Sequence, residues 1–73
     1  MNHAETFVKS IDPTMDTSRQ FCAIDKTDAT VEDITSEDML ATFPDGSAAL
    51  WINCYREWLT GPTVAATAED MRN

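Results

Sequence analysis

The feature that most constrains this chain is a stretch of apolar and aromatic residues between positions 48 and 59. Its members recur three or four residues apart, the spacing of one face of an α-helix. They are Ala48, Trp51, Ile52, Tyr55, Trp58 and Leu59. Thr60-Gly61-Pro62 follows and supplies helix stop signals. The pattern therefore predicts a main helix at 47–59, with a smaller apolar patch of Leu50 and Cys54 on its opposite side.

The segments before this stretch predict shorter elements. Alternation of apolar residues at 21–24 and β-branched residues at 30–34 favour a short β-hairpin within 20–34. An alternative starts a helix at Thr30, because Thr30-Val31-Glu32-Asp33 resembles a capping box. The segment 36–43 predicts a short helix that ends at Pro44-Asp45-Gly46. The predicted class is α+β, a small single domain with the hairpin packed on the main helix. An all-α small bundle is the alternative.

The two ends of the chain have weaker patterns. Pro13 interrupts a helix-like spacing of Phe7, Val8 and Ile11, so residues 1–18 are predicted to form a loosely ordered arm that docks through Phe7 and Ile11. Residues 62–73 are predicted to form a flexible tail. The folded core is then 19–61. A chain of 73 residues buries only about 60% of the surface that its unfolded form exposes, which leaves little material for a deep catalytic cleft.

Acidic residues dominate the charge of the chain. Thirteen acids stand against five lysines and arginines, for a net charge of −8. Seven of the acids and one base lie between Asp25 and Asp45. Such a surface repels phosphate, so we expect no direct binding to nucleic acid or to anionic membranes. It favours a protein partner with a basic surface, although acidity can also serve solubility alone.

No catalytic or metal-binding motif is recognisable. The chain has two glycines and one histidine, His3, so it lacks a phosphate-binding loop and a histidine beside a nucleophile. Cys22 and Cys54 match no zinc spacing and are expected to be buried, reduced thiols. The acids from Asp25 to Asp33 lack the pattern of a calcium-binding loop. We expect neither an enzyme nor a bound cofactor or metal.

The same sequence favours a cytoplasmic location. The N-terminus has no basic region followed by an apolar stretch, as a secretory signal would. No apolar run approaches the roughly 20 residues that span a bilayer.

The candidate partner-binding residues combine the local acidity with the predicted main helix. Glu32, Asp33, Glu37 and Asp38 are expected to form a charged rim. Trp58 and Leu50 are expected to supply the apolar contact, because aromatic side chains are enriched at binding hot spots. The competing interpretation is that aromatic residues at helical spacing, such as Trp51 and Tyr55, form the core.

In length, acidity and lack of catalytic motifs, the chain resembles the small acidic host-takeover proteins of lytic bacteriophages. These include regulators of transcription, one of them from a phage of Xanthomonas. The resemblance implies binding to bacterial RNA polymerase in the host cytoplasm, interference with promoter recognition by the σ factor, and antitermination. It rests on whole-chain character, so it carries over no individual residue. The free protein is expected to be a monomer.

Two further classes of protein fit the same composition. The first is an acidic DNA mimic that inhibits a DNA-binding host protein or defence complex, although the acids here are bunched and not spread like phosphates. The second is a regulatory subunit that folds fully only on its partner.

Overall fold

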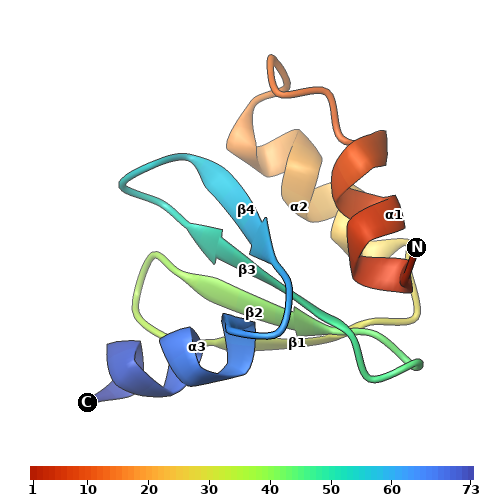
Figure 1. The fold of residues 1–73 in the computed structure, drawn as a ribbon. Helices are drawn as coiled ribbons and strands as arrows, with labels where there is room; N and C mark the ends of the chain where they lie inside the picture. Colours follow the sequence, from red (N-terminus) through yellow and green to blue (C-terminus); the bar gives the residue numbers. More distant parts are fainter.

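A computed structural model describes all 73 residues and has the α+β class (Figure 1). Four antiparallel strands form one sheet in the order β1-β2-β3-β4. Two helices precede the sheet and one follows it. The elements are α1 (His3–Ser10), α2 (Thr17–Asp25), β1 (Thr30–Asp33), β2 (Met39–Thr42), β3 (Ala48–Ile52), β4 (Glu57–Thr60) and α3 (Val64–Arg72).

The molecule has three layers, with the sheet in the middle. Figure 1 shows α1 and α2 on one side of the sheet and α3 on the other. Each side has its own apolar cluster. The cluster on the side of α1 and α2 contains Ala4, Phe7, Ile24, Met39, Ala41, Phe43, Ala49 and Trp51. The cluster on the side of α3 contains Leu50, Ile52, Val64 and Ala68.

Strand β3 lies at the centre of both clusters. Successive side chains of a strand point to opposite faces, and here both faces are covered. Ala49 and Trp51 belong to the α1 and α2 side, whereas Leu50 and Ile52 belong to the α3 side. Leu50 is 0% exposed and Trp51 is 1% exposed. Each of the five consecutive residues Ala48–Ile52 faces one of the two apolar clusters. This explains why the run contains no polar side chain.

The predicted main helix at 47–59 is wrong, because this segment forms β3, a four-residue turn and β4. The helical spacing of the aromatic residues is a coincidence of the hairpin geometry. Trp51 and Trp58 are directly opposite each other on adjacent strands, with ring centroids 5.4 Å apart. Tyr55 lies in the turn between them. A short continuous apolar run such as Ala48–Ile52 is also the pattern of a strand that is buried on both faces.

The predicted hairpin within 20–34 is half correct. Residues 30–33 do form a strand, β1, but its partner is β2 and not the segment 20–25. That segment belongs to α2, whose N-cap Asp16 accepts a hydrogen bond from the backbone N–H of Arg19 at 2.8 Å. The buried stripe of α2 consists of Gln20 and Ile24, and the polar Gln20 conceals the helical period in the sequence.

The predicted short helix at 36–43 is also wrong. Its first residues form the β1–β2 turn, and Met39–Thr42 is strand β2. Met39 and Ala41 point to one apolar cluster and Leu40 to the other, which is the alternation of a strand. The predicted turn at Pro44-Asp45-Gly46 is present, but it joins β2 to β3, with Gly46 at φ +88°.

The segments predicted as a loose arm and a flexible tail both contain helices. Helix α1 buries Ala4 and Phe7, so the predicted docking of this segment through Phe7 is confirmed, and Ile11 packs against the same cluster. Helix α3 buries Val64 and Ala68. Sequence alone underestimates both helices because each has only two buried residues. Their stability comes from packing on the sheet more than from intrinsic helix propensity.

Both cysteines lie at the surface of the molecule. Cys22 and Cys54 are exposed free cysteines, which corrects the expectation of buried thiols. Cys22 lies on the outer side of α2 and Cys54 in the β3–β4 turn, away from both clusters.

None of the three helices combines the length and the apolar character that crossing a membrane requires.

The central position of Leu50 gives a testable expectation for stability. Replacing Leu50 with Ala should lower the free energy of unfolding by about 2–5 kcal/mol, because it leaves a cavity in a fully buried site. Tyr55→Ala is the control, since Tyr55 is 71% exposed and its loss should change stability by about 0.5 kcal/mol or less. Urea denaturation followed by tryptophan fluorescence measures both. A helix at 47–59 would give Tyr55 the larger effect.

Candidate protein-binding surface

The β1–β2 turn and the β3–β4 turn lie side by side at one end of the sheet. Asn53, the first residue of the β3–β4 turn, links them. Its backbone N–H donates to Oδ1 of Asp38 at 2.9 Å. Its side-chain amide donates to Oε2 of Glu37 at 3.3 Å. Glu37, Asp38 and the β3–β4 turn thus belong to one continuous region, and Asp33 adjoins it at the end of β1, opposite Met39.

Asp38 holds this region together. Its second carboxylate oxygen accepts from the Thr35 hydroxyl at 2.8 Å. The Thr35 hydroxyl oxygen in turn accepts from the backbone N–H groups of Glu37 and Asp38 at 3.2 and 3.1 Å. Both oxygens of Asp38 are engaged, and the residue is half-buried. Asp38 therefore positions the two turns and has little free capacity for a partner.

The other three candidate acids are exposed. Asp33 ends β1, and Glu37 lies in the following turn. Glu32 forms an ion pair with Arg72 of α3. The Arg72 guanidinium lies 3.4 Å from Glu69 as well, so its charge is divided between two acids. An exposed pair of this kind contributes little to stability. Asp33 and Glu37 have no ion-pair partner and are the acids most available to a basic surface.

Tyr55 is the aromatic side chain that this region exposes. It is 71% exposed, whereas the two tryptophans are buried or half-buried. The turn that carries it ends at Arg56, whose φ of +52° is rare for a residue other than glycine. We call Asp33, Glu37, Asp38 and Tyr55 the acidic turn surface. The sequence signal for Tyr55 is weak: Asn53 is a turn-favouring residue between two apolar runs.

Leu50 and Trp58 do not join this surface. Leu50 has no exposed area and lies in the cluster on the α3 side. Trp58 packs on the opposite side of the sheet, with its ring centroid 5.5 Å from that of Phe7. The sheet thus separates the two residues from each other. Their apolar surface is used inside the molecule.

Trp58 is also tied into a small buried polar network. Its indole N–H donates to Oε1 of Gln20 at 2.9 Å. The amide group of Gln20 donates to the backbone carbonyl of Met15 at 3.0 Å. Gln20 is 5% exposed, so these two bonds satisfy a polar group that would otherwise be costly to bury. The network joins β4, α2 and the loop between the first two helices.

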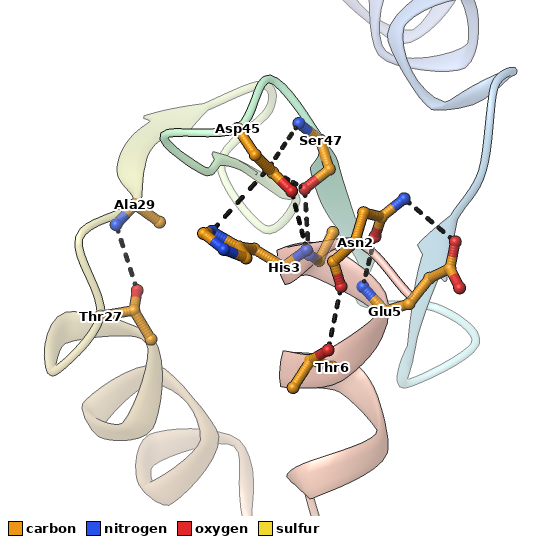
Figure 2. Close-up of polar contacts among 9 residues, drawn as sticks. Asn2, His3, Glu5, Thr6, Thr27, Ala29, Asp45 and Ser47 are labelled. Carbon is orange, nitrogen blue, oxygen red and sulfur yellow. Dashed lines mark hydrogen bonds and ion pairs between the residues drawn. The ribbon is translucent and has the colours of Figure 1, made fainter.

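A second polar cluster lies where the β2–β3 turn meets the start of α1 (Figure 2). Asp45 accepts from the backbone N–H of His3 at 2.9 Å. The Ser47 hydroxyl oxygen accepts from the backbone N–H of Ala4 at 3.0 Å and donates to Asp45. Asn2 accepts from the backbone N–H of Glu5 at 2.8 Å. Three successive N–H groups at the start of α1, which have no partner within the helix, are thereby satisfied.

The trio His3, Asp45 and Ser47 has the residue types of a hydrolase triad but another geometry. The Ser47 hydroxyl is bonded to Asp45, and the His3 ring nitrogen lies 4.0 Å from the same carboxylate. In a Ser-His-Asp triad the serine hydroxyl donates to the histidine. The cluster instead caps α1 from a turn that is distant in the sequence. The negative charge of Asp45 also interacts favourably with the positive, N-terminal end of the helix dipole.

Comparisons with protein-family models, with curated proteins and with solved structures found no match for this chain. No group of three or more His, Cys, Asp or Glu side chains is arranged so that it could hold a metal ion.

The cap predicts a specific acid sensitivity. Hydrogen bonds from the Ser47 side chain, and then from the backbone N–H groups of His3 and Ser47, lower the pKa of Asp45 from 3.8 to about 2. A lowered pKa in the folded state means that this stabilisation is present above pH 3.8 and is lost as the pH falls toward 2. Asp45→Asn should be less stable at neutral pH and should lose less stability across this window. Thermal unfolding at a series of pH values measures the difference in slope; equal slopes for the two proteins would contradict the assignment.

Proposed function

We propose that this protein binds bacterial RNA polymerase and inhibits transcription initiation by interfering with σ factor and promoter recognition. The acidic turn surface is the contact. The observation that carries the proposal is the joining of the β1–β2 and β3–β4 turns by Asn53, which brings Glu37, an acid without an ion pair, to the turn that exposes Tyr55. The choice of polymerase as partner comes from the resemblance to phage host-takeover proteins.

The charge of this surface and its exposed tyrosine support a protein partner. Asp33 and Glu37 are exposed and free of ion pairs, so they attract a basic surface and speed the encounter. Tyr55 offers a large amphipathic side chain, which is a typical hot-spot residue. RNA polymerase carries basic surfaces that serve DNA and acidic segments of the σ factor. An acidic domain that occupies one of them acts by competition and needs no chemistry.

We also propose antitermination, the second activity that the resemblance to phage host-takeover proteins implies. Competition with σ weakens promoter recognition. A protein that stays bound after initiation could then alter the response of the enzyme to terminators, which is antitermination. Both effects require only occupancy of a polymerase surface, and both should disappear together when the acidic turn surface is changed.

The test is a binding measurement with purified bacterial RNA polymerase. The wild-type protein should bind, and the double variant Asp33→Asn/Glu37→Gln should bind at least about tenfold more weakly, because each lost interfacial charge pair is worth on the order of 1 kcal/mol or more. The matched control is Asp25→Asn/Asp70→Asn, which removes the same charge from two other exposed positions. Tyr55→Ala should weaken binding without loss of fold.

Three outcomes oppose the proposal. The first is a lack of binding to polymerase. The second is equal loss of affinity in the acid variant and its control, which would indicate a general charge effect. The third is binding that does not weaken at higher salt, since contacts between exposed charges are screened. Release of another DNA-binding protein from DNA, with no polymerase contact, would favour a DNA mimic.

A further inference from the structure

The two outer strands of the sheet differ in how far their side chains are covered. Strand β4 packs one face against α1, where the Phe7 and Trp58 rings meet edge to face with centroids 5.5 Å apart. Strand β1 contacts a helix through an exposed ion pair, between Glu32 and Arg72 of α3. All four of its residues, Thr30–Asp33, are exposed, and Val31 is one of three large hydrophobic residues that are exposed in the whole chain. Proteins usually shield an edge strand, so an open one is a possible pairing site.

The register shows which backbone groups β1 leaves unpaired. The backbone N–H of Ile34 donates to the carbonyl of Asp38 at 2.9 Å, and Glu32 is opposite Leu40. In an antiparallel ladder every second residue bonds to the neighbouring strand. Residues 30, 32 and 34 therefore bond to β2. Val31 and Asp33 direct their N–H and C=O groups to the open edge.

We propose that β1 accepts a fifth strand, supplied by an extended segment of the partner that carries lysine or arginine. The backbone groups of Val31 and Asp33 provide the hydrogen bonds. Adding a strand to an exposed sheet edge is a recurrent way for a protein to bind an extended peptide.

The acids along β1 select the occupant. Glu32 and Asp33 point to opposite faces of the sheet, and Asp28 and Glu37 flank the strand. A second copy of this chain would bring the same acids against one another, and like charges opposite each other on neighbouring strands are destabilising. A basic strand forms opposite-charge pairs on both faces. The charge that prevents self-pairing is thus the charge that favours a basic segment.

This inference rests on the proposed function, which supplies a partner with a basic surface. It adds that the bound part of the partner is an extended basic segment. The probe is a short synthetic peptide in which lysine alternates with valine. A peptide with glutamate in place of lysine tests the charge. A lysine peptide that is N-methylated throughout tests the backbone, because it keeps the charge and cannot donate to an edge.

The expected result is that only the unmethylated lysine peptide binds. Amide exchange of Val31 and Asp33, followed by NMR, should slow by roughly tenfold or more at saturating peptide, because their N–H groups become hydrogen-bonded. Exchange at Glu32, which already bonds to β2, should change less. Equal binding of the methylated and unmethylated lysine peptides would overturn the proposal, since it would leave charge alone as the cause.

A pair of variants tests the strand from the side of the protein. Val31→Pro removes an N–H that faces the open edge, a position where proline is tolerated. It should reduce peptide affinity by at least about tenfold. Val31→Thr keeps the N–H and should bind like the wild type. Equal affinity of the two variants would overturn the proposal. If the proline variant does not fold, the methylated peptide decides alone.

The peptide experiment and the polymerase experiment test separate claims, so either proposal can be overturned without the other. Peptide binding without polymerase binding would support the open edge and contradict the named partner. Polymerase binding that survives Val31→Pro, together with failure of the peptide, would keep the proposed function and overturn the fifth strand. A wild-type dimer in sedimentation at neutral pH that Val31→Pro converts to a monomer would also overturn it, because the edge would then be occupied by a second copy.

Discussion

The burial of β3 on both faces is the constraint on which the rest of the structure depends. A chain of this size has room for few fully buried side chains, and Leu50 and Trp51 are two of the three largest. Because they point in opposite directions, each needs its own cover. Helices α1 and α2 cover one side and α3 covers the other, which fixes the three layers and the use of both ends of the chain. The acidic turns lie beyond these helices, and all four residues of β1 remain exposed although β1 belongs to the sheet.

The position of the acids follows from the same constraint. Charged side chains are expensive to bury, and Glu32, Asp33 and Glu37 all lie exposed. They follow β1 and the end of the sheet at which Asp38 and Asn53 join two turns. Asp38 serves the fold, whereas Asp33 and Glu37 remain exposed. Asp45, from the same acidic segment of the sequence, lies instead in the β2–β3 turn and caps α1.

The sequence predicted the class, the strand at residues 30–33 and the turn at Pro44-Asp45-Gly46, because each depends on local chemistry. It failed for 47–59, where Trp51, Tyr55 and Trp58 have a helical spacing by coincidence. Only the pairing with β2 and β4 decides between helix and strand there, and that pairing is not visible in the spacing of residues within 47–59. The acids of the candidate site could be named from composition. Leu50 and Trp58 could not be placed, because their exposure depends on which helices cover the sheet, and Tyr55 was missed for the same reason.

The capping of α1 by Asp45 and Ser47 has a consequence for the order of folding. An isolated helix of eight residues is marginal in water, and two of the acceptors that complete its first turn are more than forty residues away along the chain. The chain must close that long loop before α1 gains them, which costs entropy. We therefore expect the β2–β3 hairpin to form first and α1 to dock late. The amide protons of its first turn should then be protected by the completed tertiary structure and not by the helix itself.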